Sequence, residues 1–191
     1  ADLKRMADNP IVFALANPDP EIAYNEAIAS REDVIMATGR SDHPNKVNNV
    51  LGFPYIFRGA LDVRATGIND AMKLAAVRAI AELAKENVPD EVSSAYGTQS
   101  LNFGRDLIIP KPLDPRLITT VAPAVARAAM DSGIAQEPIS DWEQYDAQLR
   151  SRIGHDNTFS RTIAERAKKA PKRVVFAEAD NYKVLKAAEQ A

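Results

Sequence analysis

Two short runs of consecutive apolar residues lie near the start of the chain. The first covers residues 11–16 (Ile-Val-Phe-Ala-Leu-Ala) and stops at Asn17, and the second covers residues 34–38 and stops at Gly39. Unbroken apolar runs of this length are typical of parallel strands whose two faces are covered by helices. A polar stretch of helical length, residues 21–31, separates them. The pattern predicts a right-handed βαβ crossover in a doubly wound α/β sheet.

Helical periodicity dominates the middle of the chain. Apolar positions recur every three or four residues from Asn69, a suitable N-cap, to about Glu86. A second helix with an Ala/Val face is predicted over residues 120–132, with Thr120 as its N-cap and Gly133 just beyond its end. These helices should pack through small side chains.

Three segments between these elements carry loop signals. Glycines and prolines predict a long loop over residues 43–59, whose second half is apolar enough to be packed. Residues 92–102 are expected to be irregular, and the prolines in residues 110–115 exclude a helix there.

The last fifty residues give further helix and strand signals. Ser140 and Glu143 have the spacing of a capping box. The helix that follows should bury one face, formed by Trp142, Tyr145, Leu149 and Ile153. A further helix is expected from about residue 158, then a strand over residues 172–177 and one more helix. Because a strand and a helix cannot bury a core alone, we expect the chain to be a fragment of a longer protein.

Composition narrows the class of protein. Of 191 residues, 46% are hydrophobic and 26% are charged, with a formal net charge of -2, as in ordinary soluble globular proteins. The absence of cysteine excludes disulfide frameworks, thiolate metal sites and cysteine nucleophiles. No apolar run approaches the roughly 20 residues that cross a bilayer, and the first residues lack the apolar core of a signal peptide. We therefore expect a cytoplasmic protein with no membrane partner.

Charge is concentrated at one end of the chain. Residues 161–191 hold eight Lys or Arg against four Asp or Glu, which leaves a charge of -6 on the first 160 residues. Aromatic residues are scarce in this basic tail, and no nucleic-acid-binding motif is present. We expect no nucleic-acid partner.

Asparagines stand where both predicted strands end. Asn17 follows the first strand, and Asn48 and Asn49 lie in the loop after the second. Ligands of open α/β sheets bind at the carboxyl ends of the strands, and an amide can both donate and accept hydrogen bonds. These residues are candidate contacts for a carboxylate, a hydroxyl or a nicotinamide. Spacing alone favours the plainer alternative, in which Asn17 shapes an Asn-Pro turn and the other two cap loops.

The remaining candidates carry weaker signals. Thr38, Gly39 and Arg40 could bring backbone amides close to a phosphate or nicotinamide, although Thr-Gly after a strand is more often a plain turn. His43 and His155 have no partners at metal-ligand spacing. The sequence has no Gly-x-Gly-x-x-Gly, Gly-x-Ser-x-Gly, phosphate-loop or His-Glu-x-x-His motif.

Three longer segments resemble the malic enzyme family. They are residues 11–22 (IVFALANPDPEI), residues 37–62 (ATGRSDHPNKVNNVLGFPYIFRGALD) and residues 109–132, which begin IPKPLDPRLI. The resemblance extends from Leu3 to about Ile139 and is nearest to the bacterial NADP-dependent branch. It implies part of a Rossmann-like domain that acts on malate and pyruvate.

The resemblance also implies a reaction and a set of contacts. Malic enzymes oxidise malate with NADP, or with NAD, and decarboxylate the product on Mg²⁺ or Mn²⁺ to give pyruvate and CO2. Residues that match the family's substrate and nicotinamide contacts are Asn17, Asn48 and Asn49, with Thr38, Gly39 and Arg40 on the cofactor side. The family's tyrosine acid, lysine base, metal ligands and glycine-rich loop lie earlier in its order. We therefore expect no catalytic residue and no metal ligand in this chain.

Resemblance also predicts how the chain divides. Residues 1–139 would be the later part of the NAD(P)-binding domain with helices packed on it, residues 140–171 a helical linker, and residues 172–191 the start of a phosphate acetyltransferase-like domain. This order is that of the large hybrid malic enzymes, in which the acetyltransferase-like domain is thought to bind acetyl-CoA as a regulator. Residues 177–181 depart from the Pro-Glu-Gly-Glu pattern of active members, which favours regulation over acetyl transfer. We expect a homo-oligomer.

Two alternatives stay open on the sequence. The chain could belong to another 2-hydroxy or amino acid dehydrogenase that shares the sheet. It could also act chiefly as an assembly and regulatory module of a multidomain enzyme, with the helix over residues 142–153 and the basic linker docking subunits.

Overall fold

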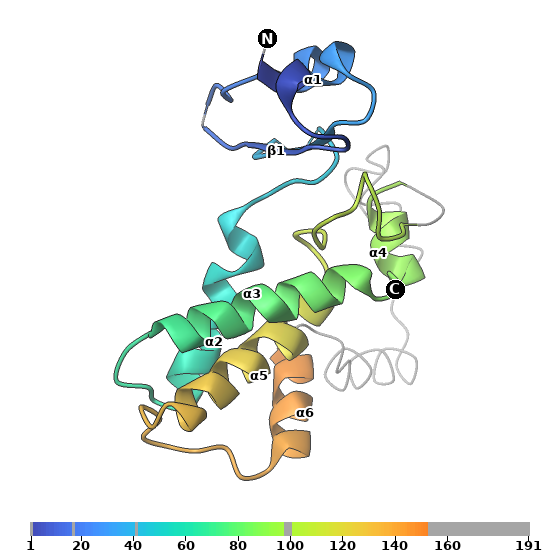
Figure 1. The fold of residues 1–191 in the computed structure, drawn as a ribbon. Helices are drawn as coiled ribbons and strands as arrows, with labels where there is room; N and C mark the ends of the chain where they lie inside the picture. Colours follow the sequence, from blue (N-terminus) through green and yellow to red (C-terminus); the bar gives the residue numbers. More distant parts are fainter. Residues whose placement is uncertain (1, 17, 41, 98–100, 153–191) are drawn as a thin grey trace, which may run out of the picture. The chain divides into compact units, whose positions relative to one another are not determined.

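The computed structural model describes residues 2–16, 18–40, 42–97 and 101–152 of the chain (Figure 1). The chain divides into two compact units, residues 1–146 and residues 147–191. Of the second unit, the description covers residues 147–152, which complete a helix begun in the first. The predicted helix from residue 158 and the predicted strand over residues 172–177 lie outside the described residues.

The described elements follow the chain in a βαβ unit and then a series of helices. In order they are η1 (Asp2–Arg5), β1 (Ile11–Ala14), α1 (Tyr24–Ser30), β2 (Ile35–Thr38), η2 (Asn49–Leu51), α2 (Phe53–Asp62), α3 (Asp70–Lys85), α4 (Asp90–Ala95), α5 (Arg116–Asp131) and α6 (Trp142–Arg152). No helix of the described parts is long and apolar enough to cross a membrane.

The two strands pair in parallel, which confirms the predicted α/β class. Ile11 lies beside Ile35 and Ala14 beside Thr38 at the two ends of the ladder. Buried residues of the strands and of α1 form a small core of Ala14, Ala27 and Met36. Strand β1 is less buried than its apolar sequence suggested, since the side chains of Ile11 and Phe13 are each 53% exposed.

A larger core lies among the helices. Figure 1 shows α5 beside α2 and α3, and these helices supply most of its buried side chains. Gly59 lets α2 approach α5 closely: an added Cβ would lie 2.9 Å from the Cβ of Val125 and nearer still to the carbonyl oxygen of Ala122. The small side chains predicted on one face of α5 therefore allow α2 to pack closely against it, as expected.

Two helix starts differ from the predictions. The helix predicted over residues 120–132 begins at Arg116, after Pro115 and not Thr120. The carboxylate of Asp114, which is buried, accepts from the backbone N–H of Arg116 at 3.0 Å and so helps satisfy the first turn. At α6 the capping acceptor is Asp141, whose Oδ1 accepts from the N–H of Gln144 at 2.9 Å, and not Ser140.

Two short helices replace predicted irregular structure. The second half of the loop predicted over residues 43–59 belongs to α2, which begins at Phe53 and has a proline in its first turn, where the missing N–H costs no helical hydrogen bond. The stretch expected to be irregular from residue 92 begins within α4. Other predictions are confirmed: Asn69 caps α3 by accepting from the N–H of Met72 at 3.0 Å, and Gly133 has the positive φ of +71° expected just past a helix.

Candidate site at the strand ends

The carboxyl end of β2 leads directly into a folded-back loop. Thr38 ends the strand and is fully buried, and its hydroxyl accepts from the backbone N–H of Arg40 at 3.2 Å. Its carbonyl accepts from the N–H of Val47 at 2.8 Å, so the loop returns alongside the strand it left. Thr38 therefore shapes the turn with its side chain, and Gly39 and Arg40 are the more accessible members of the predicted cofactor group.

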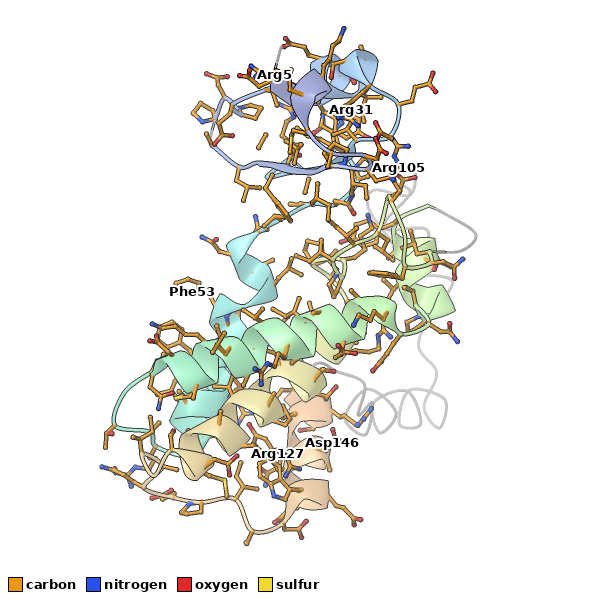
Figure 2. All side chains as sticks on the ribbon, viewed as in Figure 1. Arg5, Arg31, Phe53, Arg105, Arg127 and Asp146 are labelled. Atoms are coloured by element: carbon orange, nitrogen blue, oxygen red, sulfur yellow. The ribbon has the colours of Figure 1, made fainter. Side chains whose placement is uncertain are left out.

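Asn45 ties this loop to the rest of the unit. Its side chain is 1% exposed, and its Nδ2 donates to the carbonyl of Met36 at 3.1 Å and to the carbonyl of Arg105 at 2.7 Å. Its Oδ1 accepts from the N–H of Ile108 at 2.8 Å. The guanidinium of Arg105 adds a bond to the carbonyl of Val34 at 2.9 Å (Figure 2 labels Arg105). The side-chain amide of Asn45 therefore joins β2, the loop that follows it, and the segment of residues 105–108.

The predicted amide pair lies on one exposed turn. Asn48 and Asn49 are both exposed, and Asn48 precedes η2 while Asn49 is its first residue. The Oδ1 of Asn48 accepts from the N–H of Val50 at 2.9 Å, so this residue does cap its turn, as the plainer alternative held. Asn17 lies outside the described residues, and its predicted meeting with the pair stays a prediction.

The stretch just before Asn17 is held by a carboxylate. The side chain of Glu21 accepts from the backbone N–H of Ala16 at 3.3 Å. Backbone N–H groups, first that of Glu21 itself and then that of Ala16, lower the pKa of this carboxyl. Glu21 is therefore ionised at neutral pH and closes the turn that follows β1.

Charged and aromatic groups surround the loop after β2. The guanidinium of Arg40 forms two hydrogen bonds to the carboxylate of Asp42, at 2.9 and 2.8 Å, and this lowers the pKa of Asp42 to about 2. His43 stacks on Tyr24, the first residue of α1, with ring centroids 4.2 Å apart. Both members of the Arg40–Asp42 pair are 54% exposed, so an anionic ligand could compete for the arginine.

Sequence analysis missed Asn45, the residue with most hydrogen bonds in this region. The sequence did hold a signal for a special backbone conformation at Asn45. This residue follows Pro44 in a loop, and asparagine is, apart from glycine, among the residues that most readily adopt a positive φ. Its φ is +54°. Its partners Met36, Arg105 and Ile108 come from elements whose proximity the sequence pattern does not give.

The described residues do not supply a metal site. Among them, no three His, Asp or Glu side chains gather in a way that could hold a metal ion. No metal-dependent reaction step is therefore assigned to these residues.

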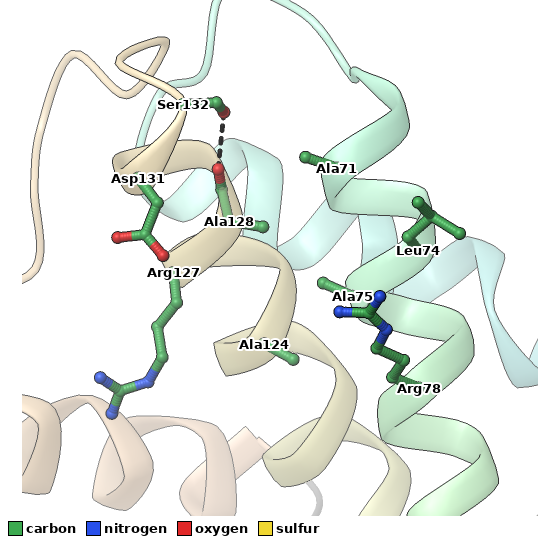
Figure 3. Close-up of a pocket in the computed structure, with 9 residues that line it drawn as sticks. All are labelled: Ala71, Leu74, Ala75, Arg78, Ala124, Arg127, Ala128, Asp131 and Ser132. Carbon is green, nitrogen blue, oxygen red and sulfur yellow. Dashed lines mark hydrogen bonds between the residues drawn. The ribbon is translucent and has the colours of Figure 1, made fainter.

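A groove lies away from the strand ends. It has a volume of about 470 Å³ and lies between α3 and α5 (Figure 3). Small side chains, among them Ala71, Ala75 and Ala124, line it together with Arg78 and Arg127. Arg127 is already engaged, since its guanidinium lies 3.5 Å from the centre of the Trp142 ring. Nothing about this groove points to a dinucleotide or a hydroxy acid.

Comparison with known proteins shows the family of this chain. The family model described as "Malic enzyme, NAD binding domain" matches residues 1–96, half of the chain. The chain belongs to the malic enzyme family. The resemblance seen in the sequence is thus confirmed at the level of the family, and the two strands and the loop after β2 lie within the matched residues.

Individual malic enzymes are similar over more of the chain. An NADP-dependent malic enzyme of Escherichia coli (strain K12) is 56% identical over 188 residues, which are 98% of this chain and 25% of that protein. One of Halomonas elongata is 63% identical over 136 residues, 71% of this chain and 32% of that protein. The chain therefore spans about a quarter to a third of the length of these relatives.

Solved malic enzymes share the fold. The enzyme of Pyrococcus horikoshii superposes with a TM-score of 0.65 at 37% identity, covering 88% of this chain and 35% of that one. The enzyme of Entamoeba histolytica gives 0.63 at 35% identity, covering 98% and 35%. The βαβ unit and its following helices are therefore part of a malic enzyme architecture.

Proposed function

We propose that the full-length protein containing this chain oxidises malate and decarboxylates the product to pyruvate and CO2, with reduction of NADP. The observation that carries the proposal is the exposed amide pair, Asn48 and Asn49, at the carboxyl end of a parallel strand within a malic enzyme NAD-binding domain. NADP is preferred to NAD because the relatives from E. coli and H. elongata are named NADP-dependent. A relative from Rhizobium meliloti that is named NAD-dependent is 50% identical, so NAD is the second choice.

The chemistry of the site suits this reaction. Neutral amides can hold a hydroxyl and a carboxylate of malate in one orientation, so that C2 faces the nicotinamide without an added charge beside the metal. Asn17 would join them from the end of β1. Arg40 could meet a cofactor phosphate in exchange for its pairing with Asp42.

Other parts of the enzyme must supply the rest. A bound Mg²⁺ or Mn²⁺ would polarise the carbonyl of the oxidised intermediate. The resemblance to malic enzymes places the ligands of that ion, and the acid and base, earlier in the family's order than the segments matched here. The 191 residues alone should therefore not turn over malate.

Length differences among relatives support the proposed domain order. The match takes in 98% of this chain in the E. coli relative but 71% in that of H. elongata, where it makes up a larger share of the whole protein. The E. coli relative thus matches nearly the whole chain, whereas the match to the H. elongata relative leaves about 55 residues of this chain uncovered. This agrees with a linker over residues 140–171 and a phosphate acetyltransferase-like domain from residue 172, with acetyl-CoA as its regulatory ligand. Cytoplasmic location and a homo-oligomer complete the proposal.

The two alternatives have less support. A different 2-hydroxy acid dehydrogenase would not be expected to match malic enzymes at more than 50% identity. A purely assembly or regulatory role is not favoured, because the matched family domain is the one that binds the cofactor.

Substitution of the amide pair in the full-length protein tests the proposal. Asn49→Ala should lower kcat/KM for malate about 10- to 100-fold, because substrate orientation is lost. Asn48→Asp keeps the oxygen that caps η2 but loses the amide donor, so a similar loss there separates substrate contact from capping. Asn87→Ala, at an exposed asparagine beyond the end of α3, is the control and should leave malate kinetics unchanged.

The same variants can refute the proposal. If Asn49→Ala and Asn48→Asp both retain the kcat/KM of the unsubstituted protein for malate, the amide pair does not contact the substrate and the site is elsewhere.

A further inference from the structure

A buried asparagine next to the amide pair has no role in substrate contact. Asn45 is 1% exposed and its side chain uses both amide hydrogens and its oxygen on backbone partners, so no ligand can reach it. Buried polar groups satisfied in this way rigidify the structure around them and are costly to leave unpaired. The bonds of Asn45 therefore fix the loop after β2, which leads to Asn48 and Asn49.

The three partners of the Asn45 side chain come from two separate segments. Met36 is in β2, Arg105 and Ile108 belong to the stretch between α4 and α5, and Asn45 itself is in the loop. The backbone carbonyl of Asn45 also accepts from the N–H of Thr38 at 3.4 Å. The loop is therefore anchored to the strand on one side and to a segment sixty residues away on the other.

This anchor lies close in sequence to the candidate contacts. Two residues separate Asn45 from Asn48, and one of them, Val47, is itself bonded to the carbonyl of Thr38. A chain advances at most about 3.5 Å per residue, so the amides of Asn48 and Asn49 cannot move far while Asn45 stays bonded. Their position is set by an interaction with β2 and with residues 105–108.

We propose that Asn45 is a positioning residue that holds the Asn48–Asn49 turn against β2, with the segment of residues 105–108 as its second support. The inference rests on the proposed malate oxidation. Its consequence is that disturbing Asn45 misplaces the amides and impairs the hydride step, although Asn45 touches neither substrate nor cofactor.

Asn45→Asp in the full-length enzyme is the direct test. The substitution keeps the shape and the acceptor for Ile108 but places an oxygen against the carbonyls of Met36 and Arg105. We expect kcat/KM for malate to fall about 10- to 100-fold, with a raised KM and a larger kinetic isotope effect for malate deuterated at C2. Asn9→Asp is the matched control, because Asn9 also has a positive φ, of 51°, but is exposed and lies outside the loop.

The isotope effect separates positioning from mere stability. Loss of folded enzyme lowers the apparent kcat but leaves KM and the isotope effect of the surviving molecules unchanged. If Asn45→Asp does not yield folded protein, Arg105→Met replaces it: it removes the bond to the carbonyl of Val34 and leaves the Asn45 side chain in place. A smaller change of the same sign is then expected in KM and in the isotope effect.

The outcomes distinguish this inference from the proposed function. If the unsubstituted enzyme does not oxidise malate, the proposed function fails. If it does, and the folded Asn45→Asp variant, or Arg105→Met in its place, has the KM and isotope effect of the unsubstituted enzyme, the positioning role is overturned.

Discussion

Gly59 provides the sharpest test of the helical core. A Cβ at this position would lie 2.9 Å from the Cβ of Val125, 3.1 Å from the backbone nitrogen of Ala126 and closer still to the carbonyl of Ala122. Two of these three atoms belong to the backbone of α5, which cannot rotate away. Val125 and Ala126 are fully buried, so α2 and α5 must move apart to admit even one methyl group.

The expected cost follows from two opposed effects. Alanine is the better helix former by about 1 kcal/mol, which favours Gly59→Ala. Overpacking a filled core costs roughly 1–3 kcal/mol, occasionally more, and a clash with rigid backbone belongs at the upper end. We therefore expect Gly59→Ala to lower the free energy of unfolding by about 2 kcal/mol.

Thermal unfolding of the full-length protein measures this loss against a matched control. Gly67→Ala makes the same change where an added Cβ meets nothing within 4 Å, so it should be neutral or slightly stabilising. A change of 1 kcal/mol corresponds to about 2–4 °C in a domain of this size, so the Gly59→Ala midpoint should lie several degrees below that of Gly67→Ala. Equal midpoints for the two variants would refute the close packing of α2 on α5.

Two further predictions concern a helix cap and acid stability. Asn69→Ala should cost about 1 kcal/mol by leaving the N–H of Met72 without its acceptor, whereas Asn69→Asp should keep most of it in the same thermal assay. The pKa of Asp33 is lowered by hydrogen bonds from Arg31 and from the N–H of Asn9, so its stabilisation is present above about pH 4 and disappears as the pH falls below that. Asp33→Asn should therefore flatten the acid limb of a plot of unfolding midpoint against pH, and an unchanged acid limb would contradict the assignment.

Local sequence patterns predicted several of the regular elements of this chain. The parallel strand pair, the α3 cap at Asn69 and the terminating Gly133 all follow from side-chain chemistry within a few residues, and each is confirmed. The start of α5 was predicted four residues too late, because Thr120 looks like a cap in the sequence while the actual first turn uses the carboxylate of Asp114.

Tertiary contacts explain what the sequence did not give. The helix α2 was not predicted because its sequence contains glycine and proline, which usually indicate a loop. Gly59 is tolerated within it because a larger side chain would clash with α5. Asn45 likewise gains its role from Arg105 and Ile108, whose nearness depends on the folded chain. The amide pair was singled out from its place after a strand and lies within the residues that match the family model, and its contact with a substrate stays a prediction.

The stoichiometry of malate oxidation tests the central claim most directly. The full-length protein, supplied with L-malate, NADP and Mn²⁺, should form NADPH and pyruvate in equal amounts, with one CO2 for each. Reduction of NADP without pyruvate, or no malate-dependent reduction of NADP or NAD at all, would contradict the assignment of this chain to a malate-oxidising, decarboxylating enzyme.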